Sequence, residues 1–104
     1  MAIITVTKEN FESIVLQAAA PVLVDFWADW CRPCKQLAPL LEAVAADNPG
    51  MTIAKINVDD QPELAAQYGI ASIPTLLVFD KGQVVKESVG VIPKHRIEAL
   101  LEQI

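Results

Sequence analysis

Residues 22–35 read VLVDFWADWCRPCK, and this stretch decides how the rest of the chain is interpreted. Its first seven residues are apolar on both alternating faces apart from one aspartate, which is typical of a buried, parallel strand. The only two cysteines of the chain follow, separated by two residues. Beyond them, apolar residues recur at helical spacing, at Leu37, Leu40, Leu41 and Val44. The stretch therefore predicts a strand that leads into a helix, with a cysteine pair at the junction.

Strands and helices alternate in the first two thirds of the chain. The β-branched run at residues 2–6 predicts a first strand, and Thr7 is placed to cap the helix that follows it. A further strand is predicted at residues 51–59, and a short helix that begins at a proline is predicted over residues 62–68. The apolar face of the helix after Thr7 consists of Phe11, Ile14, Val15 and Ala18.

The last third of the chain predicts an antiparallel hairpin and a final helix. The turn residues at 80–82, DKG, separate two apolar runs at residues 74–80 and 83–89. The order of elements, without internal repeats or linkers, predicts one three-layer α/β domain with a mixed sheet over residues 1–104. The apolar face of the final helix consists of Ile97, Leu100, Leu101 and Ile104.

The composition argues against several classes of partner. The chain has 104 residues, a net charge of −5, two arginines and six lysines, and no cluster of basic residues. Neither a nucleic-acid surface nor an anionic membrane surface is expected from such a charge distribution. The N-terminus has no signal-peptide pattern, and no apolar run reaches the roughly 20 residues that span a bilayer. We therefore expect a cytoplasmic protein.

Three kinds of site compete for the cysteine pair. A structural zinc site needs about four ligands, whereas this chain offers two cysteines and one distant histidine, His95, so no metal is expected. A structural disulfide between cysteines so close in sequence would stabilise the fold little. A redox-active pair is favoured because Cys-x-x-Cys beside a βαβ pattern is typical of a dithiol site. Pro33 suits the first helical turn, which places Cys31 at the helix N-terminus, where a thiolate is stabilised.

The chain resembles the thioredoxin family along its whole length. The family's signature has the same residues as the cysteine stretch at every position but one. The resemblance implies the thioredoxin fold, a three-layer α/β/α arrangement with a central mixed five-stranded sheet flanked by four helices. It also implies an enzyme, a thiol-disulfide oxidoreductase that reduces protein disulfides. The segments that carry it are VDFWADWCRPCK (24–35), KINVDD (55–60), YGIASIPTLLVF (68–79) and Val89-Gly90.

The resemblance assigns roles to four residues. Cys31 is the nucleophile, Cys34 resolves the mixed disulfide, Asp25 accepts the proton of Cys34, and Lys55 modulates Asp25. The strand pattern alone leaves Asp25 either buried, with a raised pKa, or at a strand end in water. Lys55 either approaches Asp25 or extends to the surface. Asp59 and Asp60, later in the chain, are expected to be capping and solvated turn residues.

A substrate-binding surface is also implied. Sequence alone predicts a trans bond before Pro74, whereas the family's equivalent proline is cis and faces the cysteines. The cis form is therefore expected, with the backbone of Ile73 pairing with an extended client segment. An apolar surface around Cys31 is expected from Trp30, Ile73, Pro74, Gly90 and Val91.

Arg32 is the departure from the family, which places glycine at this position. We expect Arg32 and Pro33, the two residues between the cysteines, to tune the redox potential. A cation beside Cys31 favours its thiolate, stabilises the reduced form and makes the protein more oxidising. The alternative is a tolerated surface substitution without effect on the potential.

The resemblance further implies how the protein is supplied with electrons. No cofactor is bound, and electrons come from NADPH through a separate flavin-dependent thioredoxin reductase. The partners are that reductase and disulfide-containing client proteins, and the protein works as a monomer in electron transport and cell redox homeostasis. Two alternatives stay open: a thioredoxin-fold binding subunit of a larger complex, and a more oxidising oxidoreductase because of Arg32.

Overall fold

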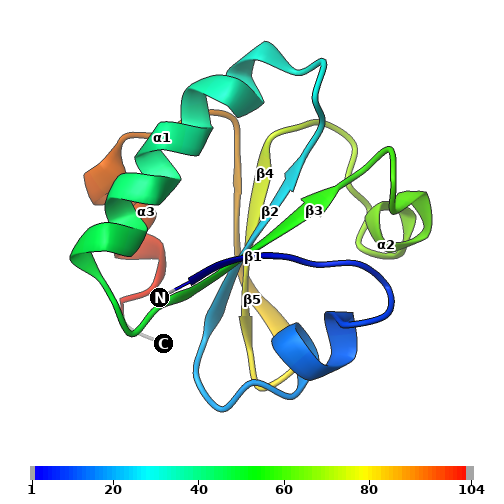
Figure 1. The fold of residues 1–104 in the computed structure, drawn as a ribbon, viewed down its shortest axis with the longest axis horizontal. Helices are drawn as coiled ribbons and strands as arrows, with labels where there is room; N and C mark the ends of the chain where they lie inside the picture. The colour runs from blue at the N-terminus through cyan, green and yellow to red at the C-terminus, as the bar shows by residue number, and fades with distance from the viewer. Residues whose placement is uncertain (1, 103–104) are drawn as a thin grey trace.

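A five-stranded sheet in the order β1-β3-β2-β4-β5 runs through the middle of the protein, in a computed structural model that describes residues 2–102 (Figure 1). β1 is parallel to β3 and β3 to β2, whereas β4 is antiparallel to both β2 and β5. The predicted mixed sheet is therefore confirmed. The strands are β1 (Ala2–Thr5), β2 (Val22–Trp27), β3 (Thr52–Asn57), β4 (Thr75–Asp80) and β5 (Gln83–Val89).

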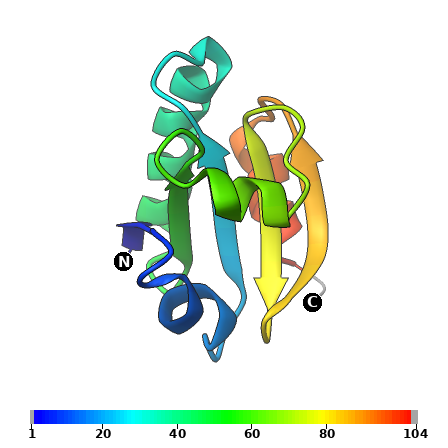
Figure 2. The same cartoon turned by 90° about the vertical axis from the view of Figure 1, so that its right-hand side faces the viewer.

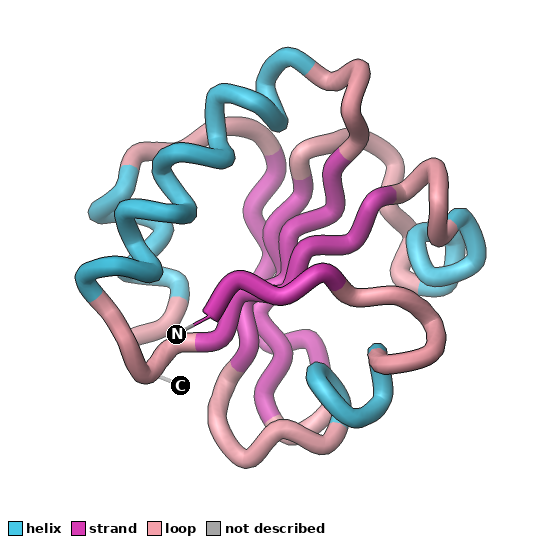
Figure 3. Tube along the Cα trace, in the orientation of Figure 1, coloured by secondary structure: helices cyan, strands magenta, loops and turns pink. Residues whose placement is uncertain are grey.

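Helices cover both faces of the sheet, which gives the three expected layers (Figures 1 and 3). Two helices, α1 and α3, pack on one face over a core that includes Leu23 and Ile53. The other two, η1 and α2, pack on the opposite face over Val24 and Phe26. The helices are η1 (Glu12–Leu16), α1 (Arg32–Asp47), α2 (Pro62–Gln67) and α3 (Lys94–Leu100).

The first helix differs from the sequence prediction. Thr7 does not cap it: the Thr7 hydroxyl accepts a hydrogen bond from the Glu9 N–H at 3.3 Å, while Asn10 Oδ1 accepts one from the Thr7 N–H at 2.7 Å. These bonds close a turn, and the helix begins only at Glu12 as the π-helix η1, with the Gln17 N–H bonded to the Glu12 carbonyl. The side chain of Asn10 therefore competes with helix formation in this segment.

The predicted hairpin between β4 and β5 is confirmed, but its turn is one residue shorter than the predicted 80–82, because Asp80 is the last residue of β4 and pairs with Gln83. Lys81 and Gly82 both have positive φ, at 52° and 82°, as a turn matched to the twist of the strands requires. Gly82 is also close to the backbone of Leu16, where an added Cβ would lie 3.1 Å from the carbonyl oxygen. Gly82 thus brings the hairpin against the end of η1.

The final helix buries the face that its spacing predicts. Ile97 is fully buried under α3, and Leu100 and Leu101 are half-buried against the same core. The fourth predicted position, Ile104, lies outside the described residues. Within residues 2–102, no helix has the length and apolar character that crossing a membrane requires.

Candidate active site

One edge of the sheet gathers segments that are far apart in the sequence. Because β2 and β3 are parallel, the loops that follow them leave the same edge. β4 is antiparallel to β2, so β4 begins at this edge and the segment before it lies there. β5 is antiparallel to β4 and therefore ends at the same edge. Figure 2 shows these loops together at one end of the sheet. The expected site residues of the loops are thus brought to one place by the topology.

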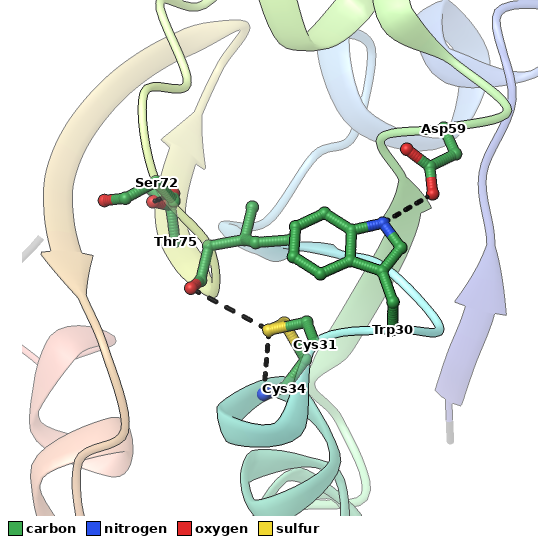
Figure 4. The surroundings of a disulfide bond; sticks show 7 residues. Trp30, Cys31, Cys34, Asp59, Ser72 and Thr75 are labelled. Atoms are coloured by element: carbon green, nitrogen blue, oxygen red, sulfur yellow. Dashed lines mark hydrogen bonds between the residues drawn. A yellow bond between two sulfur atoms is a disulfide. The ribbon is translucent and has the colours of Figure 1, made fainter.

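The cysteine pair lies where β2 leads into α1 (Figure 4). Cys31 is the N-cap residue of α1 and Cys34 lies in its first turn. They form a disulfide with Cα atoms 5.2 Å apart, and the Cys34 N–H donates a hydrogen bond to the Cys31 Sγ at 3.2 Å. An N–H group and the positive end of the helix dipole therefore both face the sulfur that is expected to act as a thiolate.

The two cysteines are largely covered although they lie at the edge of the sheet. Each is only 4% exposed, and both pack with Ala28, against which Trp27 and Ile73 also lie. The two residues between them, in contrast, are exposed. A reaction partner must therefore approach the Cys31 sulfur closely and contact the neighbouring side chains at the same time.

The loop before β4 forms the wall opposite Cys31. The Ile73–Pro74 peptide bond is cis, as the resemblance implies. The carbonyl oxygen of Ile73 lies 3.8 Å from the Cys31 Sγ, and the Pro74 carbonyl accepts a hydrogen bond from the Gly90 N–H at 2.8 Å. Three expected surface residues, Ile73, Pro74 and Gly90, are thus brought beside the disulfide, and the pairing of Ile73 with a client stays a prediction.

Trp30 forms a second side of the site. Its side chain is 70% exposed, and its Nε1–H donates a hydrogen bond to Asp59 Oδ2 at 2.9 Å. Figure 4 shows the indole nitrogen directed toward Asp59. The structure thereby adds Asp59 to the site, where the sequence predicted only a capping and solvated turn residue. Asp59 lies two residues after the end of β3. Because β3 is parallel to β2, this position in the sequence was the signal that could have placed Asp59 near Trp30.

The expected apolar surface is only partly exposed. Trp30 and Val91 are exposed, Ile73 and Gly90 are half-buried, and Pro74 is buried. A pocket of about 400 Å³ lies between Trp30, Ile73 and the segment from α2 to β4. Val91 follows Gly90 on the way to α3, and its contact with a client stays a prediction.

Asp25 is a buried carboxyl on the same face of β2 as Leu23, beneath α1. It is 1% exposed, and its Oδ1 atom has no hydrogen-bond partner among the described residues. Burial raises the pKa of the Asp25 carboxyl from 3.8 to about 7, although the charge of Lys55 opposes the rise. The alternative of an aspartate in water is therefore wrong. Near neutral pH the carboxyl both takes up and releases a proton, which suits a proton acceptor.

Lys55 lies directly opposite Asp25 in the neighbouring strand. Its side chain is half-buried, and its Nζ atom lies 4.7 Å from the centroid of the Trp27 ring. The expected approach of Lys55 to Asp25 is thus present, and its modulating role in the reaction stays a prediction. Within residues 2–102, no group of three or more histidine, cysteine or acidic side chains is placed to hold a metal ion.

Comparisons with known proteins agree with this geometry. A family model described as "Thioredoxin" matches residues 2–103. A thioredoxin of Streptomyces clavuligerus is 53% identical over 89 residues, which cover 86% of this chain and 83% of that protein. A thioredoxin of Alicyclobacillus acidocaldarius is 48% identical and covers 99% of this chain and 98% of its own. A thioredoxin of Haemophilus influenzae is 43% identical, with 97% and 95% covered.

Proposed function

This chain belongs to the thioredoxin family, and we propose that it is a protein-disulfide reductase. After each reaction with a client, a second protein, a reductase, returns it to its reduced form. It is a thiol-disulfide oxidoreductase with Cys31 and Cys34 as its reacting pair. The observation that carries the proposal is the placement of this pair at the N-terminus of α1, with the buried Asp25 beneath the helix. The match to the family over nearly the whole chain favours this function over a binding subunit.

The first step is attack by the reduced protein. The Cys31 thiolate forms a bond to one sulfur of the client disulfide, and the client's sulfur–sulfur bond breaks. The other client sulfur leaves with the electron pair as a thiolate and takes up a proton. The Cys34 N–H and the dipole of α1 stabilise the attacking thiolate, because both place positive charge toward the Cys31 sulfur.

The second step releases the client. The Cys34 thiol gives its proton to the Asp25 carboxylate and attacks the Cys31 Sγ, and the remaining client sulfur leaves as a thiolate. The client disulfide has then gained two electrons, and the protein has lost two and carries the Cys31–Cys34 disulfide seen in the structure. A carboxyl with a pKa of about 7 suits this transfer because it accepts the proton and gives it up again near neutral pH.

The third step returns the protein to its reduced form. We propose that a flavin-dependent thioredoxin reductase supplies two electrons from NADPH, so that this chain itself binds no cofactor. We further propose that the protein acts as a monomer in the cytoplasm. A compartment that keeps thiols reduced suits a pair whose disulfide is a transient, catalytic state.

An insulin reduction assay tests the proposal. With dithiothreitol as the electron source, we expect the wild-type protein to accelerate the precipitation of the reduced insulin chains. Cys31→Ser should lose the acceleration because it lacks the nucleophile, and Cys34→Ser should lose turnover because the mixed disulfide is not resolved. A wild-type protein that does not exceed dithiothreitol alone would contradict the proposed function. A Cys34→Ser variant that turns over normally would contradict the role of Cys34.

A further inference from the structure

Two exposed cations lie beside the reacting disulfide. Arg32 is the first residue of α1, directly after Cys31, and Lys35 follows three positions later on the same side of the first turn. Neither side chain forms an ion pair within the part of the chain that the structure describes. Their charges also oppose the positive end of the helix dipole. Once Cys31 loses its negative charge by bonding to a client sulfur, this arrangement is unfavourable, and a negative charge on the client would relieve it.

This basic character is local. The chain as a whole carries a net charge of −5. Two other lysines are already paired, Lys8 with Glu63 and Lys94 with both Asp47 and Glu98. On the Trp30 side of the site the charge is negative, because Asp59 accepts the hydrogen bond of the indole. Cys31 therefore lies in the chain between Trp30, whose ring is bonded to an acidic residue, and the basic Arg32.

We propose that Arg32, supported by Lys35, is a specificity-determining residue that favours client disulfides with a carboxylate side chain next to the attacked cysteine. The inference rests on the proposed reductase function and names the chemistry of the clients that it prefers. Since Cys31 must come within bonding distance of the client sulfur, the residues beside that sulfur pass the first turn of α1, which begins at the exposed Arg32. Guanidinium groups bind carboxylates through two parallel hydrogen bonds, a geometry that glycine at this position does not offer.

The expected preference is modest because the arginine is exposed. Exposed ion pairs contribute about 0.2–1 kcal/mol, which corresponds to an advantage in rate of up to about fivefold. Salt should reduce the advantage, since the screening length falls from about 10 Å at 0.1 M to about 3 Å at 1 M. The chemical step itself is unchanged: the Cys31 thiolate bonds one client sulfur, and the other leaves with the electron pair.

Two peptide disulfides that differ in one residue test the proposal. One carries aspartate next to the cysteine and the other carries asparagine, and each is reduced by the pre-reduced protein in a single turnover. The rate constants are divided by those measured with dithiothreitol, which removes the effect of aspartate on the peptide's own sulfur. The ratio of the two corrected rates is calculated for each variant and then compared between variants. Any change in the reactivity of Cys31 affects both peptides equally and cancels in this ratio.

The chain offers a matched control in its second arginine. Arg96 lies in α3, is exposed and is far from the cysteines in sequence. At low salt we expect the wild-type protein to reduce the aspartate peptide about 1.4- to fivefold faster than the asparagine peptide. Arg32→Gln should bring the ratio close to one, whereas Arg96→Gln should keep the wild-type ratio, and added salt should lower it.

Two outcomes would overturn the proposal, and both differ from the outcome that would contradict the proposed reductase function. Equal corrected rates for both peptides in the wild-type protein would show that no charge preference exists. A preference that persists in Arg32→Gln, or disappears equally in Arg96→Gln, would show that Arg32 does not determine it. If the wild-type protein reduced neither peptide, the proposed reductase function would fail, and this inference with it.

Discussion

The side chain of Arg32 sets a charge beside the sulfur that must ionise. We predict that the wild-type protein is more oxidising than Arg32→Gly, because the cation stabilises the thiolate of the reduced form. Since Arg32 is exposed, the difference should be small, about 5–20 mV for an interaction of roughly 0.2–1 kcal/mol. Equilibration of both proteins with a glutathione buffer measures it, and Arg32→Gln separates charge from backbone effects. Equal potentials in all three proteins would leave Arg32 without a tuning role.

The buried carboxyl of Asp25 makes the stability of the oxidised protein depend on pH. Its pKa rises from 3.8 to about 7 on folding, so the folded state holds the proton more tightly than the unfolded state. The stabilisation from proton binding is therefore present at low pH and is lost as the pH rises through this window. At pH 8 the burial of the charge costs about 4 kcal/mol, at about 1.4 kcal/mol for each pKa unit.

Asp25→Asn removes this dependence because asparagine does not titrate. Relative to wild type, its unfolding free energy should increase by about 2–3 kcal/mol between pH 5 and pH 8, as measured by guanidinium denaturation without reductant. Asp29→Asn, at an exposed aspartate, is the matched control and should show no such gain, since that charge stays hydrated. A difference between Asp25→Asn and wild type that is constant with pH would show that Asp25 is ionised throughout.

Sequence patterns predict the reacting residues better than their surroundings. The cysteine spacing places Cys31 without reference to other segments, whereas the strand pattern alone leaves the burial of Asp25 open and only the resemblance favours its role. The bond between Trp30 and Asp59 joins two loops that are 29 residues apart, and it depends on the parallel pairing of β2 and β3. No local pattern encodes that contact, so the role of Asp59 becomes visible only once the strands are paired.

At the scale of elements, three aromatic rings connect η1, α2 and β4. The ring of Phe11, just before η1, lies 5.7 Å from that of Tyr68 and 5.8 Å from that of Phe79, and these two are 5.2 Å apart. We predict that Phe11→Ala destabilises the protein by about 3–5 kcal/mol, as is usual for a buried phenylalanine. Denaturation with guanidinium measures it. Val85→Ala, on the exposed strand β5, should cost far less, and similar costs for both would contradict this packing.

The first helix shows the limit of periodicity at this scale. The apolar spacing of Phe11 and Val15 correctly predicts which side chains face the core. It does not locate the start of the helix, because the Asn10 side chain closes a turn that occupies the expected first residues. The position of the hairpin turn is predicted more closely than the start of the first helix, because the left-handed backbone conformations of the turn need residues such as Gly82.

At the scale of the whole molecule, the mixed sheet explains why one edge holds the site. Two parallel strands end there, the antiparallel β4 begins there, and β5 returns there. The alternation of apolar runs predicts the layers and the mixed sheet. It does not predict that the Ile73 carbonyl lies 3.8 Å from the Cys31 sulfur, because this distance depends on the order β3-β2-β4 in space.

The central claim is that Cys31 attacks and Cys34 resolves, and trapping of the intermediate tests it most directly. Each single-cysteine variant is reduced, mixed with a peptide disulfide and analysed by intact mass spectrometry without reductant. We predict that Cys34→Ser accumulates one covalent peptide adduct that dithiothreitol removes. Cys31→Ser should form far less, because the N-cap position and the N–H hydrogen bond that stabilise a thiolate belong to Cys31. Equal adduct formation by both variants, or formation mainly by Cys31→Ser, would contradict the account.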